Sequence, residues 1–215
     1  MRFALFYPSL ISDWNHGNAH FLRGVARDLL ARGHEVRVFE PEDAWSVQNL
    51  RSDHGDAALA AFAAAYPGLS SRRYGASLDL DEATDGCDAV IVHEWNEPDL
   101  VARLGARRTR ARWKLLFHDT HHRSVTTPHE IARYDLRHYD GVLAFGRVIR
   151  DLYRARGATA WTWHEAADTR LFRPMAGSRD GDLVWVGNWG DDERQRELPE
   201  LLIEPVRSLG LRARV

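Results

Sequence analysis

The 215-residue sequence predicts an α/β protein built on a doubly wound, parallel sheet. Short apolar runs alternate along the chain with segments whose apolar residues recur at helical spacing. Residues 3–7, 22–30 and 35–39 form the first strand, helix and strand, close enough in sequence for one βαβ unit with parallel strands. Residues 89–92 are apolar throughout, which is typical of a strand covered by helices on both faces.

The remaining elements continue this alternation. Further strands are predicted at residues 113–117, 141–145 and 159–163, and further helices at residues 56–66, 98–104 and 148–155. We expect Gly105 to end the helix that starts at Pro98. Thr127 and Glu130 have the spacing of a capping box, with Pro128 at the first helical position.

The alternation is interrupted at residues 173–182, which are polar, turn-rich and typical of a linker. Residues 1–172 therefore form the first predicted domain. A strand at 183–186, a helical stretch at 193–209 interrupted by Pro205, and the start of a strand at 211–215 follow. One strand and one helix cannot bury a core. We therefore expect residues 183–215 to be the incomplete beginning of a second α/β domain.

Composition excludes several classes of protein. The formal net charge is −2, so the basic excess that favours a nucleic-acid partner is missing. No run reaches the ~18 apolar residues that a membrane span needs. The N-terminus also lacks the pattern of a signal peptide, and we expect a cytoplasmic protein. The single cysteine, Cys87, rules out a disulfide framework and argues against a cysteine-based zinc site.

The loop after the first strand is a candidate ligand site, because ligands of open parallel sheets bind beyond the carboxyl ends of the strands. It leads through Gly17 and Asn18 into the first helix. A glycine lets the backbone approach a ligand, and a helix N-terminus favours an anion. The loop contains neither a dinucleotide-binding fingerprint nor a Walker A lysine. The alternative is an ordinary strand-to-helix loop.

Two polar clusters follow the strands at 89–92 and 113–117, and they should face one crevice. The first contains His93 and Glu94, and the second contains His118, Asp119 and His121. A histidine can exchange protons near neutral pH, and an aspartate can orient it or stabilise its positive charge. The alternative for each histidine is a hydrogen-bonded surface residue.

A metal site is a competing interpretation of the same clusters. Its nitrogen and oxygen ligands would come from His93, Glu94, His118, Asp119, His121 and His122. Their spacing matches no established zinc motif such as His-Glu-x-x-His. We therefore expect no bound metal.

Four segments carry a resemblance to a known family. They are the first strand, loop and helix ending at residues 32–36, the segment FHDTHH at 117–122, YDGVLAFG at 139–146, and HEAADTRLFRP at 164–174. In this order they resemble the GT-B glycosyltransferases, in particular the family 4-like group and the CgeB-like spore-maturation glycosyltransferases. The last segment is similar to the family's Gly-Val-Asp-x-x-x-Phe-x-Pro, with Ala166 in place of the glycine.

The resemblance implies a Rossmann-like N-terminal domain on the acceptor side and a C-terminal domain on the donor side. It implies a nucleotide-sugar co-substrate, an unknown acceptor and no further cofactor. His118, with Asp119, would lie beside the transferring sugar. Gly17, Asn18, Gly187 and Asn188 would lie near the diphosphate. From their place after the strands, His93, Glu94 and His121 are further candidate substrate-binding residues.

One departure limits what this chain should do alone. The family's donor-binding Glu-x7-Glu element would lie beyond Val215, so we expect the chain by itself to transfer little sugar. The alternatives are a non-catalytic module that binds a glycan or nucleotide, and a GT-B-like nucleotide-sugar epimerase or hydrolase.

Overall fold

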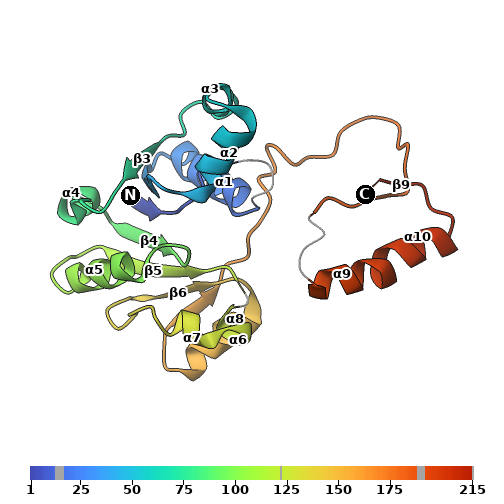
Figure 1. Ribbon diagram of the computed structural model, residues 1–215. Coiled ribbons are helices and arrows are strands. Elements are labelled where there is room, and N and C mark those ends of the chain that lie inside the picture. Colours follow the sequence, from blue (N-terminus) through green and yellow to red (C-terminus); the bar gives the residue numbers. More distant parts are fainter. Residues whose placement is uncertain (13–16, 122, 188–191, 215) are drawn as a thin grey trace. The chain divides into compact units, whose positions relative to one another are not determined.

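The computed structural model describes residues 1–12, 17–121, 123–187 and 192–214. The chain divides into two compact units, Met1–Phe172 and Arg173–Val215 (Figure 1), which are described separately below.

The first unit contains a seven-stranded sheet in the order β3-β2-β1-β4-β5-β6-β7, and every neighbouring pair of strands is parallel. The predicted α/β class is therefore confirmed. The strands are β1 Arg2–Phe6, β2 Glu35–Pro41, β3 Ser71–Tyr74, β4 Ala89–His93, β5 Lys114–Asp119, β6 Gly141–Ala144 and β7 Ala160–Thr162.

Helices cover both faces of this sheet, as a doubly wound fold requires. One core packs Leu5 and Ile91 of the sheet against Leu22 of α1 and Phe62 of α3. The other core includes Val92 with residues of α4, α5 and α8. The helices (Figure 1) are α1 Gly17–Ala31, α2 Trp45–His54, α3 Ala57–Ala65, α4 Leu80–Thr84, α5 Pro98–Arg108, α6 Arg123–Thr126, α7 Pro128–Ile131 and α8 Gly146–Ala155.

The strand order reverses between β1 and β4. From β1 the chain adds β2 and β3 on one side and then returns to add β4 on the other side. Connections therefore leave the carboxyl ends of β1 and β4 in opposite directions, which opens a crevice between them. The register pairs Phe6 with Val92 and His93 with His118, so Tyr7, His93 and His118 end three adjacent strands.

Two predictions about helix ends are wrong. Helix α5 does not stop at Gly105 but continues to Arg108. A Cβ added at Gly105 would lie 3.6 Å from Cε2 of Tyr139, which is an ordinary van der Waals contact. Thr127 makes no capping hydrogen bond at α7. The predicted partner Glu130 forms an ion pair with Arg123 instead, at 3.4 Å.

The strand β3 was not predicted, because its sequence, SRRY, is polar. It lies at the edge of the sheet, where charged side chains are tolerated. Arg72 pairs with Glu82 at 2.6 Å, and Arg73 reaches Glu40 at 3.9 Å. These contacts are made between residues distant in sequence, so no local pattern indicates them.

The second unit is a small α/β arrangement. Strand β8 (Leu183–Val184) pairs in parallel with β9 (Ala213–Arg214), and between them lie α9 (Asp192–Leu198), the π-helix η1 (Pro199–Ile203) and α10 (Glu204–Ser208). Pro205 was predicted to interrupt the helical stretch, but it lies in the first turn of α10, where proline is tolerated. Of the leucines in this helical stretch, Leu198 and Leu202 are buried, whereas Leu201 and Leu209 are 69% and 70% exposed.

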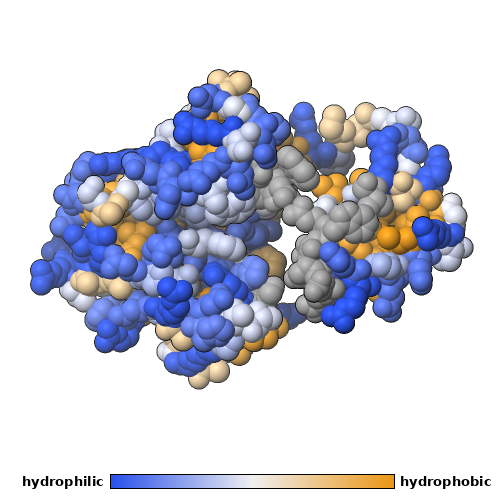
Figure 2. Space-filling model, viewed as in Figure 1, coloured by the Kyte–Doolittle hydropathy of each residue, from blue (hydrophilic) through white to orange (hydrophobic). Residues whose placement is uncertain are grey.

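Two observations describe the surface. None of the helices in the described part of the chain is both long and apolar enough to cross a membrane. On the face of the first unit shown in Figure 2, hydrophilic residues predominate and the apolar residues form small, separate patches.

Candidate functional site

Three aromatic rings form a row where β1, β4 and β5 end. The ring centroids of Tyr7 and His93 lie 4.9 Å apart, and those of His93 and His118 lie 5.5 Å apart. The Tyr7 hydroxyl makes a 2.7 Å hydrogen bond with Nδ1 of His118. The row therefore spans the crevice at the strand-order reversal, the place where open α/β sheets bind ligands.

His118 is fully buried in this row. Its ring packs against Phe21 of α1 and against Trp163, at centroid distances of 5.6 and 4.8 Å. Burial without a charged partner disfavours the imidazolium, and it lowers the pKa of His118 to about 3. The imidazole is therefore neutral at physiological pH, so the predicted proton exchange by His118 near neutral pH does not hold in this structure.

Buried polar atoms without a partner gather at the same edge. Among the described residues, Nε2 of His118 has no hydrogen-bond partner, and neither do the hydroxyl oxygens of Ser9, Ser12, Ser124 and Thr127. All five residues lie at the ends of β1 and β5 or in the segments that follow them. Such atoms are rare in folded proteins, so each needs an explanation. A polar ligand or ordered water at the carboxyl edge of the sheet provides one.

His93 is held by neighbours on both sides of its ring. Its Nδ1 accepts a 3.1 Å hydrogen bond from the backbone N–H of Trp95, which places the ring proton on Nε2. Nε2 lies 3.2 Å from Oγ1 of Thr120 and 3.4 Å from the side-chain amide of Asn18. The Asn18 amide is satisfied on both sides when its nitrogen donates to Glu165, 2.9 Å from Oε2. Asn18 thus connects His93 with Glu165.

Glu165 was not predicted as a site residue, although it lies within the segment 164–174 that carries the family resemblance. Its carboxyl group is partly buried, and burial, followed by the negative charge of Glu94, raises its pKa to about 7. Glu165 is therefore partly protonated near neutral pH. The sequence signal was present as a carboxylate directly after the strand at 159–163, at the same end of the sheet as His93.

Asp119 lies on the opposite face of the sheet from His118, because successive side chains of a strand alternate. Its Oδ2 accepts a 2.8 Å hydrogen bond from the Tyr153 hydroxyl of α8, and its Oδ1 accepts from the backbone N–H of His121 at 3.2 Å. Burial, with the nearby charge of Glu94, raises the pKa of Asp119 to about 7. Tyr7, not Asp119, orients His118, and the predicted pairing of the two side chains is wrong.

Glu94 is fully buried and holds the segment that follows β5. Its Oε2 accepts hydrogen bonds from Nε and Nη2 of Arg123 at 3.2 and 2.6 Å. Its Oε1 accepts from the backbone N–H and the hydroxyl of Thr120 at 2.8 and 2.9 Å. The Arg123 guanidinium also lies 4.9 Å from the ring centroid of Trp95. The Glu94 carboxylate thus accepts four hydrogen bonds from Thr120 and Arg123. It positions these residues, and both of its oxygens already have partners within the protein.

Two further buried charges fix the loop after β1, and sequence analysis missed both. Oε1 of Glu40 in β2 accepts from the backbone N–H groups of Leu10 and Ile11 at 2.7 and 3.3 Å. Arg23 of α1 donates to the carbonyl oxygens of Leu10 and Ser12 at 2.8 and 3.0 Å. Charged side chains at such positions are rarely buried without partners. The available signals in the sequence were the charge of Glu40 at the end of a predicted strand and the charge of Arg23 beside the apolar residues of a predicted helix.

The other predicted residues are placed as follows. Gly17 begins α1, and a Cβ added there would meet no atom within 4 Å. His121 lies against Trp95, with ring centroids 6.1 Å apart. Gly187 belongs to the second unit, where an added Cβ would lie 2.9 Å from the Trp185 ring. His122 and Asn188 lie outside the described residues.

Within the first unit, the structure therefore gathers six of the predicted residues at one edge of the sheet: Asn18, His93, Glu94, His118, Asp119 and His121. They do not form a metal-binding group. Across the described residues, no three histidine, cysteine, aspartate or glutamate side chains are arranged to hold an ion.

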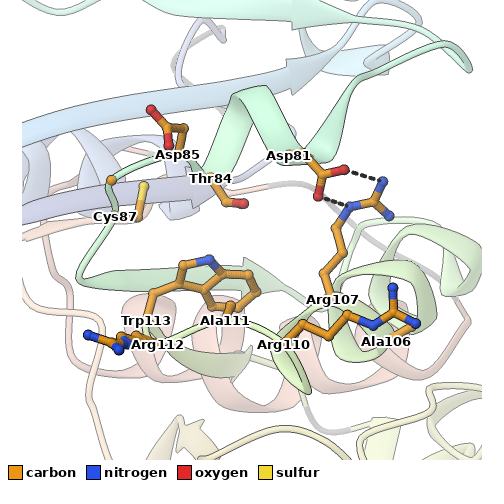
Figure 3. A pocket seen from close by; sticks show the side chains of 11 residues that line it. Asp81, Thr84, Asp85, Cys87, Ala106, Arg107, Arg110, Ala111, Arg112 and Trp113 are labelled. Atoms are coloured by element: carbon orange, nitrogen blue, oxygen red, sulfur yellow. Dashed lines mark hydrogen bonds and ion pairs between the residues drawn. The ribbon is translucent and has the colours of Figure 1, made fainter.

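A cavity of about 610 Å³ lies at the opposite, amino edge of the sheet (Figure 3). Cys87 and Trp113, which precede β4 and β5, line it together with residues of α4 and α5. Arg107 reaches across to Asp81 at 2.8 Å. This cavity is separated by the length of the strands from the histidine row and shares no lining residue with it.

Solved structures with a similar fold provide the comparison with known proteins. No known protein-family profile matches the chain, and no curated protein matches it. An alpha-glucosyltransferase in complex with UDP and a 13-mer DNA containing an HMU base matches 96% of this chain at 14% identity, with a TM-score of 0.56. A complex of an alpha-glucosyltransferase with UDP-glucose and DNA containing an abasic site matches with the same values. A third complex, with UDP and DNA containing an A:G mismatch, matches 77% of the chain at a TM-score of 0.50.

The fold of this chain is similar to that of these alpha-glucosyltransferases. The matches cover 55% of the two first-named glucosyltransferase chains and 41% of the third, so this chain spans about half the length of the structures it resembles. At 14% identity the likeness concerns the fold alone.

Proposed function

We propose that this chain belongs to a glycosyltransferase that moves a sugar from a nucleotide-sugar donor to an acceptor without a bound metal or further cofactor. In this proposal residues 1–172 form the acceptor-side domain, residues 173–182 form the linker, and residues from 183 begin the donor-side domain. The GT-B fold supports the proposal, as do the UDP and UDP-glucose bound by the similar structures. Membership of the CgeB-like group and a cytoplasmic location are part of the same proposal.

The observation that carries the proposal is the neutral, buried His118 at the strand-order reversal, with Nε2 unpaired. The Tyr7 hydroxyl bonded to Nδ1 fixes the ring orientation. A neutral imidazole can exchange a hydrogen bond with a sugar hydroxyl without placing a charge beside the reacting carbon. A sugar that reaches Nε2 must displace part of the aromatic cover formed by Phe21 and Trp163.

The donor diphosphate would bind at the start of α1. The N-terminal end of this 15-residue helix carries Gly17 and Asn18 at the carboxyl edge of the sheet. Backbone N–H groups and the helix dipole stabilise a negative charge there. Such preorganised dipoles can stabilise a departing diphosphate without a metal. Gly187 and Asn188 would approach the diphosphate from the donor-side domain.

The two carboxyl groups that titrate near pH 7 supply the remaining chemistry. Asp119 and Glu165 each have a pKa raised to about 7. A carboxyl group of this kind can accept or release a proton near neutral pH. Glu165 is connected through Asn18 to His93, beside His118, and is therefore placed near the reacting sugar in this proposal.

Release of free UDP from UDP-glucose tests the proposal. A transferase releases UDP only when an acceptor is present, whereas a hydrolase releases it without one. The assay should compare residues 1–215 with a version extended through a complete second domain, for which we expect the larger activity. UDP formation without acceptor would favour a hydrolase. Binding of a nucleotide or glycan with no turnover in either version would favour a non-catalytic module.

A further inference from the structure

A second cavity lies at the carboxyl edge of the sheet. It measures about 670 Å³ and is lined by the segments that follow β1, β2, β3 and β4, together with the start of α5. This volume is in the range of small-molecule sites. All its lining residues belong to the first unit and lie within the described part of the chain.

Three aromatic residues line this cavity. Trp45 and Trp95 remain 45% and 44% exposed, and Tyr74 is partly buried. Exposed tryptophan faces at a concave site can stack on a sugar ring or attract a cation. Trp95 also contacts Arg123 and His121, so the cavity lies directly beside the cluster of Glu94 and Asp119.

Carboxylates dominate the charge of the cavity. Glu42, Asp43, Glu97 and Asp99 line it, against a single cation, Arg103, which pairs with Asp99 at 3.6 Å. Within the described residues, no ion pair involves the other three carboxylates.

Two of these carboxylates, Asp43 and Glu97, come to the cavity wall from separate segments of the chain. Burial, and then the charges of Asp43, Glu40 and Glu97, raises the pKa of the Tyr74 phenol. Asp43 follows β2 and Glu97 follows β4, so the two segments approach the same phenol from different strands. The hydroxyl of Tyr74 is itself fixed by donating to Oδ1 of Asn96 at 2.9 Å. The negative charge of the cavity is therefore built by separate segments and is not a run of neighbouring residues.

We infer that this cavity binds the acceptor, and that the acceptor is a small saccharide bearing amino groups. The inference rests on the proposed glycosyltransferase function. Ammonium groups would pair with Asp43 and Glu97, and the sugar rings would stack on Trp45 and Trp95. The same negative charge repels the phosphates of a nucleic acid, which needs lysine or arginine contacts to bind. The position beside Trp95 brings a bound acceptor to the edge of the candidate site.

Calorimetry on the 215-residue chain tests the inference with a matched pair of trisaccharides. The glucosamine trimer should bind at least about tenfold more tightly than its fully N-acetylated counterpart, because acetylation removes the charges that pair with the carboxylates. The double variant Asp43→Asn/Glu97→Gln should lose this preference, whereas Asp53→Asn/Asp56→Asn, at exposed positions in α2 and at the start of α3, should keep it. Equal binding of the two trimers would overturn the inference, and so would a preference that survives in the cavity variant.

Two further ligands test whether the cavity recognises charge alone or a nucleic acid. Trilysine should bind more weakly than the glucosamine trimer, and a short duplex DNA should not compete with the trimer. Trilysine binding of equal strength would show that charge alone is recognised, and displacement by DNA would contradict the charge argument. Trp45→Ala should weaken the binding of both trimers. If circular dichroism shows that this variant is unfolded, Glu42→Gln is measured in its place, and it should weaken the binding of the glucosamine trimer.

UDP-glucose is measured in parallel, in this chain and in the version extended through a second domain. Donor binding without trisaccharide binding would refute only the acceptor inference. Trisaccharide binding with no donor binding or turnover in either version would refute the proposed glycosyltransferase function. The conclusion that the cavity binds an amino saccharide would then still hold.

Discussion

His118 and Asp119 are consecutive residues of β5, but their side chains lie on opposite faces of the sheet. His118 contacts Phe21 of α1, whereas Asp119 accepts a hydrogen bond from Tyr153 of α8. Both side chains are buried, and burial disfavours the charged form of each. It lowers the pKa of His118 to about 3 and, with the charge of Glu94, raises the pKa of Asp119 to about 7. Two adjacent residues therefore make opposite contributions to the pH dependence of stability.

The first prediction concerns this pH dependence. The pKa of Asp119 is about 7 in the folded chain and ~3.9 when unfolded, so the folded state binds more protons in between, and stability falls as the pH rises from about 4 to 7. The pKa of His118 is about 3 when folded and ~6.5 when unfolded, so its contribution rises with pH between those values. Asp119→Asn should remove the falling contribution.

The variant's free energy of unfolding, relative to wild type, should therefore increase with pH by roughly 1 kcal/mol per unit between pH 4.5 and 6.5. Glu165, whose pKa is also raised to about 7, remains in both proteins and cancels in the difference. Urea unfolding of both proteins at four pH values measures this difference. Asp53→Asn, the same substitution at an exposed position, is the control. A difference that does not change with pH would show that the Asp119 carboxyl is not shifted in the folded chain.

The second prediction concerns the burial of His118. His118→Ala removes a ring packed between Phe21 and Trp163, and we expect a loss of about 2–4 kcal/mol in the free energy of unfolding. Tyr7→Phe keeps the packing but leaves Nδ1 of His118 unpaired, which should cost about 1–3 kcal/mol. Replacement of the exposed His129 by alanine is the control, expected within about 0.5 kcal/mol of wild type.

Turnover of the extended enzyme, measured below the melting temperature of each variant, separates stability from function. Both His118→Ala and Tyr7→Phe should lower kcat if the oriented imidazole contacts the sugar. Full turnover by folded His118→Ala would make His118 a packing residue only.

The central strands could be predicted from the sequence because β4 and β5 are apolar and buried, and burial on both faces leaves a local pattern. The edge strand β3 leaves no such pattern, since Arg72 and Arg73 are satisfied by residues far along the chain. The sequence pattern also placed His93 and His118 at the ends of neighbouring strands, where the structure has them. Strand alternation could have shown that His118 and Asp119 do not face each other. The links from Glu40 and Arg23 to the loop after β1 join distant segments, and only the fold reveals them.

The third prediction concerns the buried ion pair of Glu94 and Arg123. Removal of one partner leaves a charge without compensation, so Arg123→Met should lower the free energy of unfolding by about 3–5 kcal/mol. The double variant Glu94→Gln/Arg123→Met should be less destabilised than the sum of the two single variants, because neither charge then remains. Guanidinium or urea unfolding of the four proteins measures the coupling.

A matched control is the exposed pair of Arg137 and Asp135, which are 2.7 Å apart. Because an exposed pair contributes only about 0–1 kcal/mol, Arg137→Met should have a small effect. Additive effects of the substitutions at Glu94 and Arg123 would contradict the coupling that the geometry implies.

The last prediction distinguishes a glycine needed for binding from one needed for packing. A Cβ at Gly17 would meet no atom within 4 Å, and alanine favours a helix over glycine, so Gly17→Ala should leave the melting temperature unchanged or slightly higher. A Cβ at Gly141 would lie 2.4 Å from Cζ3 of Trp161 and 3.0 Å from the carbonyl oxygen of Thr159. Gly141→Ala should therefore destabilise the fold by about 1–3 kcal/mol, as overpacking does.

If the backbone at Gly17 approaches the donor diphosphate, the added methyl group of Gly17→Ala occupies space that the phosphate oxygens need. UDP-glucose should then bind at least about tenfold more weakly to the extended enzyme carrying Gly17→Ala, although its stability is unchanged. Gly177→Ala, also in open space but in the second unit, is the matched control and should bind the donor normally. Unchanged UDP-glucose affinity in Gly17→Ala would remove the start of α1 from the donor site, because stability and folding could not account for the result.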